Sequence, residues 1–138
     1  MNIDELAPEV WAKAPHLREL LAGQSIPAPT GWHVLVLQYI RPQKVGSIIM
    51  SDRTRTEDEY QGRVGLVLAL GPDAYSDKVK FGSGPWCKPG DWIVWPAVEA
   101  ATSRFAYGPR VNGERAILTL VSDDRVLATN VDPALAIA

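Results

Sequence analysis

Cysteine and histidine are scarce in this chain. Its 138 residues include one cysteine, Cys87, and two histidines, His16 and His33. A single cysteine excludes an internal disulfide and a site with several thiolate ligands, and a metal centre would have to be assembled from distant carboxylates. A phosphate-binding loop is also missing, since Gly82-Ser83-Gly84 has neither the required lysine nor a helix pattern after it. We therefore expect no metal and no cofactor.

The chain also lacks a field of charge of one sign and any long apolar run. It has 14 Lys and Arg against 16 Asp and Glu, and the basic residues are scattered. Without a basic stripe, nucleic acid is not expected as a partner. No apolar run approaches the length of a membrane span, and the N-terminus lacks the basic-then-apolar pattern of a secretion signal. We expect a cytoplasmic protein without a membrane partner.

Length and composition predict one domain preceded by an N-terminal arm. A hydrophobic content of 46% in 138 residues allows one core and hardly two. Residues 1–30 combine prolines with short helical patterns, and Gly23 is a plausible stop, so we expect one or two short helices and an extended arm. The arm would cover the rest of the chain, a neighbouring copy or another protein. We place the folded domain at residues 31–133 and a tail at 134–138.

From Gly31 onward the pattern is that of short strands and tight turns. The run from Trp32 to Ile40 lacks clean alternation, which predicts burial on both faces. Asn112-Gly113 is a strong hairpin signal, and Lys88-Pro89-Gly90-Asp91 is a turn signal. We expect strands at residues 32–40, 62–70, 92–95, 104–107, 115–121 and 125–130. The predicted fold class is all-β, a small partly open barrel.

One segment departs from this pattern. The apolar triplet Ile48-Ile49-Met50, which we call the hook, is followed by a run of purely polar residues at 51–59. Such a composition suits a mobile loop, from about Pro42 to Gln61, that carries the hook to a partner and orders on binding. An ordinary short edge strand leading into a solvated turn is the alternative.

The order of these features resembles the GroES-type co-chaperonin family. Four segments carry the resemblance, and each is weak alone but more specific in this order and spacing. Gly46 to Met50 resemble the family's Gly-Gly-Ile-Val-Leu, and Gly62 to Pro72 resemble its Gly-x-Val-x-x-Val-Gly-Pro. Lys88 to Trp95 resemble its Val-Gly-Asp-x-Val, and Asp123 to Thr129 resemble its closing Asp-Asp-Ile-Leu-Ala-Val. The resemblance covers roughly residues 31–133.

The chain departs from the family in several places. One glycine precedes the hook where the family usually has two, Glu99-Ala100-Ala101 replaces a glycine, and the N-terminal arm is extra. Residues 73–87 form a long segment whose family equivalent is a roof hairpin over the opening of a ring, so we call it the roof segment. A long roof segment and divergent loops resemble the members that large bacteriophages encode.

The resemblance implies a GroES-like β-barrel that assembles into a heptameric ring. The ring would cap a GroEL-type chaperonin and assist its ATP-dependent folding of client proteins, with chaperonin contacts at Gly46, Ser47, Ile48, Ile49 and Met50. In the family, the C-terminal strand of one subunit pairs with the N-terminal strand of the next. This implies exposed edge strands and an interface at Val34, Val36, Val126, Leu127 and Ala128. A phage-encoded member would act in the host cytoplasm, with a capsid protein as a plausible client.

Other interpretations follow from the residues alone. The same strands could simply complete a monomeric barrel. A viral structural or decoration protein could use the barrel as a binding module and attach through Trp11 and Leu17 of the arm, and the five tryptophans fit a binding surface. An enzyme could use Cys87 with a histidine, or Asp123-Asp124. However, a lone cysteine is usually a small buried hydrophobe, and adjacent residues on a strand point to opposite faces. We favour a co-chaperonin that is not an enzyme.

Overall fold

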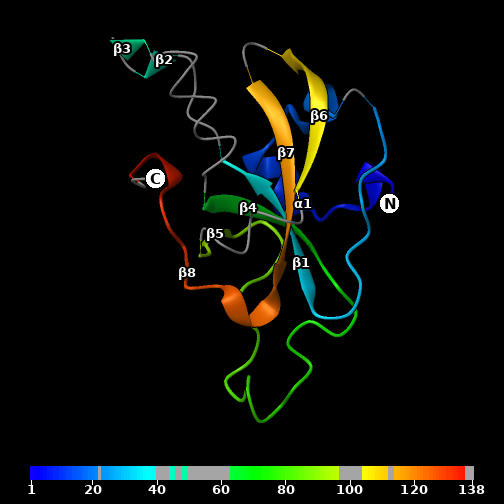
Figure 1. The fold of residues 1–138 in the computed structure, drawn as a ribbon, viewed down its shortest axis with the longest axis vertical. Coiled ribbons are helices and arrows are strands. Elements are labelled where there is room, and N and C mark those ends of the chain that lie inside the picture. The colour runs from blue at the N-terminus through cyan, green and yellow to red at the C-terminus, as the bar shows by residue number, and fades with distance from the viewer. Residues whose placement is uncertain are drawn as a thin grey trace.

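A six-stranded antiparallel sheet forms the body of the protein in the computed structural model (Figure 1). The structure describes residues 1–21, 23–39, 63–96, 104–111 and 114–135, and the backbone of two short strands at 44–45 and 48–49. In spatial order the main strands are β6 (Arg104–Val111), β7 (Glu114–Ser122), β1 (His33–Gln38), β4 (Val64–Leu70), β5 (Trp92–Val94) and β8 (Ala128–Thr129). Of the predicted all-β, partly open barrel, the described residues show a mostly-β chain with two short helices and no closure of the sheet into a barrel. Over these residues the sheet is open, with β6 and β8 at its edges.

Strand β1 lies in the middle of the sheet. It pairs with β7 along one side and with β4 along the other. Its side chains alternate between two cores, with Leu35 and Leu37 in one and Val34 and Val36 in the other. Burial on both faces is therefore confirmed. The expectation that β1 is an exposed edge is wrong, because β4 and β7 occupy both of its hydrogen-bonding sides.

The N-terminal arm packs on one face of the sheet. It holds a 3-10 helix at Ile3–Glu5 and the short helices α1 (Pro8–Lys13) and α2 (Leu17–Leu20), as the sequence predicts. Helix α1 contacts β4, and α2 contacts β6 and β7. The arm buries with the sheet the side chains of Ile3, Leu6, Val10, Ala14, Leu17, Leu20, Leu21 and Ile26. Of the three surfaces considered above, the arm therefore covers its own chain. The boundary at residue 30 stays a prediction, although both parts share this core.

The roof segment packs on the opposite face. It consists of turns without a strand, and its side chains Tyr75, Phe81 and Cys87 are buried beside Val34 and Val36. The ring of Phe81 meets that of Tyr75 edge-on at 4.8 Å, in the geometry that aromatic pairs prefer. Segments of one chain thus cover both faces of the sheet.

The predicted hairpin joins β6 to β7. Val111 pairs with Glu114, which leaves a two-residue connection at Asn112-Gly113, and these two residues lie outside the described part. The strands it joins confirm the expected pair at 104–107 and 115–121, with both strands longer than predicted. The Asn112-Gly113 turn signal therefore predicted the pairing of β6 with β7 correctly.

The C-terminal strand is shorter than the sequence predicts. Asp123–Arg125 form a 3-10 helix, and only Ala128–Thr129 pair with β5. The turn before β5, at Lys88–Asp91, is formed as expected, since Asp91 N–H donates to the Lys88 carbonyl at 3.1 Å. Strand β8 is therefore a two-residue edge strand.

Candidate partner-binding site

The hook belongs to an insertion between β1 and β4 whose stem is closed. The segment at 40–63 connects Tyr39, directly after β1, to Val64 at the start of β4, and Tyr39 N–H donates to the Val64 carbonyl at 2.8 Å. The Tyr39 ring also packs edge-on against Trp92 of β5, with ring centroids 5.9 Å apart. The two ends of the insertion are therefore held next to each other at one place on the sheet.

Part of the hook lies on a small hairpin of its own. Strand β2 (Lys44–Val45) pairs with β3 (Ile48–Ile49) in a separate two-stranded sheet, with Lys44 opposite Ile49 and Val45 opposite Ile48. Figure 1 shows this hairpin at the far upper left, well away from β1 and β4. Two of the predicted chaperonin contacts, Ile48 and Ile49, are thus on an element outside the main sheet.

The remaining predicted contacts on this segment lie outside the described residues. These are Gly46, Ser47 and Met50. The expected mobility of residues 42–61 is not tested by the short strands described there, and it stays a prediction. The sequence analysis kept a short edge strand as the alternative to a mobile loop, and Ile48–Ile49 do form a short strand, although its pairing with Lys44–Val45 was not predicted.

The C-terminal edge of the sheet exposes apolar side chains. Val126 is buried, whereas Leu127 is 66% exposed and Ala128 is exposed. Leu127 N–H donates to the Val94 carbonyl at 2.8 Å, which ties this segment to β5. Beside it lies a hollow of about 410 Å³, lined by Trp86, Val126, Leu127, Ala128 and Thr129. Three predicted interface residues therefore lie together at an edge that has no second strand in the described part of the chain.

The other two predicted interface residues lie elsewhere. Val34 and Val36 are fully buried in the centre of the sheet. Both hydrogen-bonding edges of their strand are used by β4 and β7, so the strand that contains them is not open to a neighbour. The fold gives these two residues a core role.

The two edges of the sheet differ in their suitability for strand addition. Edge strand β6 contains Pro109, and its register with β7 shifts between Tyr107 and Val111. A proline without an N–H group and an irregular register are features that block edge-to-edge pairing. Edge strand β8 holds Ala128 and Thr129. Of the two edges, β8 is the better suited to accept another strand.

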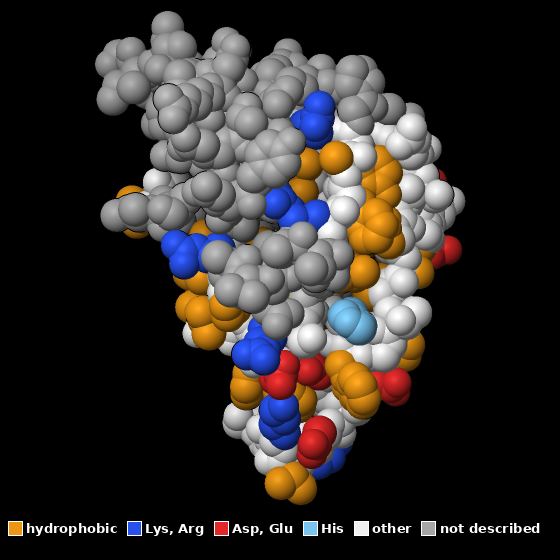
Figure 2. All heavy atoms as spheres, viewed as in Figure 1, with side chains coloured by type: hydrophobic (Ala, Val, Ile, Leu, Met, Phe, Trp, Pro, Cys, Tyr) orange, Lys and Arg blue, Asp and Glu red, His pale blue; other side chains and the backbone are white. Residues whose placement is uncertain are grey.

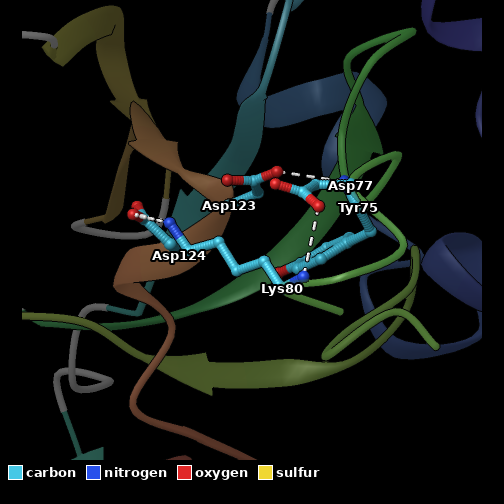
Figure 3. Close-up of polar contacts among 5 residues, drawn as sticks. All are labelled: Tyr75, Asp77, Lys80, Asp123 and Asp124. Atoms are coloured by element: carbon cyan, nitrogen blue, oxygen red, sulfur yellow. Dashed lines mark hydrogen bonds and ion pairs between the residues drawn. The ribbon is translucent and has the colours of Figure 1, made fainter. Parts of the chain in front are cut away.

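A polar cluster joins the roof segment to the end of β7 (Figure 3). Asp123 is only 5% exposed and accepts the backbone N–H of Tyr75 at 3.0 Å. Asp124 forms an ion pair with Lys80 at 2.7 Å, and this contact lowers the pKa of the Asp124 carboxyl. Asp77 caps the loop by accepting the N–H of Lys80 at 3.1 Å. The two adjacent aspartates thus have separate partners, which favours a structural role over a carboxylate pair.

This cluster borders a second hollow of about 370 Å³. Trp32 and Phe81 contribute to its wall, together with Asp77, Lys80, Ser122, Asp123 and Asp124. Figure 2 shows acidic and basic side chains interspersed over the lower part of this face of the molecule. Among the charged residues here, Lys80 and Asp124 pair with each other, while Asp77 and Asp123 accept backbone N–H groups. No signal in the sequence pointed to the burial of Asp123.

Cys87 sits in surroundings that keep its thiol protonated. The side chain is buried, and its Sγ shares a hydrogen bond with the Tyr75 hydroxyl at 3.3 Å. Burial raises the pKa of the Cys87 thiol to about 11, and burial together with this bond raises the pKa of the Tyr75 phenol. An activated cysteine needs the opposite shift. His33, by contrast, is exposed, with its Nδ1 3.0 Å from the Thr30 carbonyl oxygen.

Comparison with protein-family models and with the curated proteins finds no match. No protein-family model matches the chain, and none of the curated proteins matches it. Within the described ranges, no three metal-ligating side chains come together, and no helix has the length and apolar character to cross a bilayer. The case for a function therefore depends on the candidate partner-binding elements above.

Proposed function

We propose that this protein is a GroES-type co-chaperonin that caps a GroEL-type chaperonin. The observation that carries the proposal is the placement of Ile48–Ile49 on a hairpin outside the main sheet, in an insertion with a closed stem. In this proposal the open six-stranded sheet is the main part of a GroES-like barrel. The resemblance of four sequence segments to the co-chaperonin family supplies the identity of the partner.

Binding through the hook would be weak for one copy and strong for a ring. Burial of an Ile or Met side chain contributes roughly 1.5–3 kcal/mol. Ordering a loop costs about 1–2 kcal/mol per residue, so ordering only a few of its residues already offsets most of what Ile48, Ile49 and Met50 contribute. Once one loop of a ring is bound, the others bind intramolecularly at a high effective concentration. Weak single contacts would let the cap leave when the chaperonin changes its nucleotide state.

The ring contact would use the β8 edge. Leu127 is exposed beside an apolar hollow, and β8 has a free edge in the described part of the sheet. An added strand from a neighbour would extend the sheet there, in a head-to-tail contact that closes into a ring. The partner strand is not β1, which is paired on both sides. We expect a heptamer by resemblance to the family.

The experiment for the hook compares two charge substitutions at apolar positions. Ile49→Asp places a carboxylate in an apolar groove of the partner, and an unpaired buried charge costs several kcal/mol. Val79→Asp is the matched control, because Val79 is 95% exposed on the roof segment. Co-elution with a GroEL-type chaperonin plus nucleotide should be lost for the first variant and kept for the second. A hook variant that binds like the parent would remove the main support for this function.

The ring is tested separately by native mass spectrometry. The parent chain should give one dominant species matching a heptamer. Leu127→Asp should dissociate it, while Val79→Asp should leave it assembled. A monomeric parent at micromolar concentration would contradict the ring and favour a monomeric barrel.

A further inference from the structure

One face of the sheet is apolar across three of its strands. Leu35 and Leu37 of β1, Leu66 and Leu68 of β4, and Ala116 and Leu118 of β7 form this face, and all of them are buried. The buried side chains packed with them come from residues 1–26. Without that cover, this face would present a large apolar surface to water, of the kind that marks an interaction or aggregation site.

The arm is attached to the rest of the chain at several points. Val10, Leu17 and Leu21 are fully buried, and Figure 1 shows the arm in blue behind the sheet. The Lys13 amine donates to the Gly90 carbonyl in the turn before β5. Helix α1 packs directly on that turn, because a Cβ at Gly90 would lie 2.6 Å from Cβ of Glu9.

The beginning and end of the arm are also joined to each other. The amino group of Met1 donates to the Ile26 carbonyl, and Ile26 N–H donates to the Met1 carbonyl at 3.0 Å. Both residues pack with the same core, Ile26 within it and Met1 against it. The arm is thus closed at its ends, attached near its middle through Lys13, and buried along its apolar side.

We propose that the N-terminal arm is an intramolecular strap, which allows a single copy of the chain to fold fully before any assembly. The arm covers one face of the sheet and the roof segment covers the other, so neither face needs a neighbouring copy. The large apolar side chains left exposed in the described ranges are Trp32, Val79, Phe105, Leu127 and Leu135, and none of them belongs to either core. This inference depends on the packing alone and holds whether or not the chain forms a ring.

The competing arrangement is an arm exchanged between copies. The arm is joined to β1 by residues 24–30, which have no regular secondary structure and include Pro27 and Pro29. Exchange of an identical segment is a simple route to oligomers. An exchanged arm makes unfolding depend on protein concentration by mass action, whereas a strap within one chain does not.

The test measures unfolding of a monomeric full-length chain. If the parent chain forms a ring, the Leu127→Asp variant supplies the monomer. If the parent chain is already a monomer, it is used directly. The test can therefore be carried out even if the ring proposal fails. Urea unfolding is followed by tryptophan fluorescence and circular dichroism over an about hundredfold range of concentration. We expect one cooperative transition with a constant midpoint. A midpoint that rises with concentration, or a monomer without a cooperative transition, overturns the proposal.

A pair of variants on α2 tests the strap itself. Leu17→Asn introduces an amide at a fully buried position, whereas Glu19→Asn introduces it at an exposed position of the same helix. The first should lower the urea midpoint strongly or abolish the cooperative transition, and the second should unfold like the parent. Equal midpoints for both variants would show that the arm contributes nothing to the fold, which would also overturn the proposal.

Discussion

Gly65 in β4 is a position at which one added methyl group should destabilise the fold. A Cβ at this position would lie 2.4 Å from Cγ1 of Val36, 2.6 Å from the carbonyl oxygen of Leu37 and 2.9 Å from the ring of Trp95. Val36 and Trp95 are fully buried, and Leu37 belongs to the β1–β4 ladder, so none of the three is free to move away. Gly65→Ala therefore requires β1 and β4 to separate locally.

The expected loss of stability is about 2 kcal/mol. Overpacking a core costs about 1–3 kcal/mol, and three contacts below 3.0 Å place this site at the upper end of that range. The reduced entropy of the unfolded chain returns about 0.4–1 kcal/mol for a change from glycine to alanine, which leaves about 2 kcal/mol. With an unfolding entropy of about 2.1 cal/mol/K per residue, a chain of 138 residues should lose about 7 °C in Tm. The assay is thermal unfolding by circular dichroism at one fixed protein concentration, because assembly would shift Tm.

Gly82→Ala is the control for this experiment. A Cβ at Gly82 would meet the Lys78 carbonyl oxygen at 3.3 Å, a much milder contact. We expect this variant to lie within about 0.5 kcal/mol of the parent. If Gly65→Ala unfolds at the same temperature as Gly82→Ala, then β1 and β4 are not packed as described here, and the closed stem of the insertion is in doubt.

Three further predictions concern the polar contacts beneath the roof segment. Asp123→Ala leaves the backbone N–H of Tyr75 without its acceptor and should cost about 1–3 kcal/mol in urea unfolding, whereas Asp123→Asn, which keeps an acceptor, should cost less. The Cys87 thiol, with a pKa raised to about 11, should react with a thiol reagent near pH 8 only after denaturation, and Cys87→Ser should keep any ring and chaperonin binding; rapid labelling of the native protein would contradict its burial. The lowered pKa of Asp124 stabilises the fold above the pKa of this carboxyl in the unfolded chain, and the contribution disappears as pH falls through the folded pKa. The small difference between parent and Asp124→Asn should therefore vanish in acid, and a difference that persists there would have another cause.

Local signals in the sequence were sufficient for much of the sheet. The lack of alternation in β1 predicted burial on both faces, and Val34 to Leu37 do alternate between two cores. Asn112-Gly113 predicted the β6–β7 hairpin, because a two-residue turn of this type sets the register of the strands on either side. Both features depend on residues that are neighbours in the sequence, and for this reason they could be predicted from it.

Features that depend on contacts between residues far apart in the sequence could not be predicted in this way. Short helical patterns in residues 1–21 gave no information on which surface they would cover, and only the fold shows Leu17 beneath β6 and β7. The edge position assigned to β1 failed for the same reason, since strand order is set by long-range pairing. The burial of Asp123 depends on Tyr75, which is 48 residues away in the sequence. The backbone of Tyr75 has a φ of +60°, which no sequence pattern predicted.

The contrast between the two sheet edges bears on how assembly would be controlled. A long, flat, apolar edge invites indiscriminate pairing, and natural proteins interrupt such edges or keep them short. Here Pro109 and a register shift interrupt the longer edge strand, β6, while β8 pairs over only two residues. A two-residue strand offers few hydrogen bonds to an arbitrary partner, so productive addition at β8 would require a fit to the hollow beside Leu127 as well. Selectivity for a matching copy of the chain would then come from side-chain packing, and for this reason a charge at Leu127 is the sharpest probe of assembly.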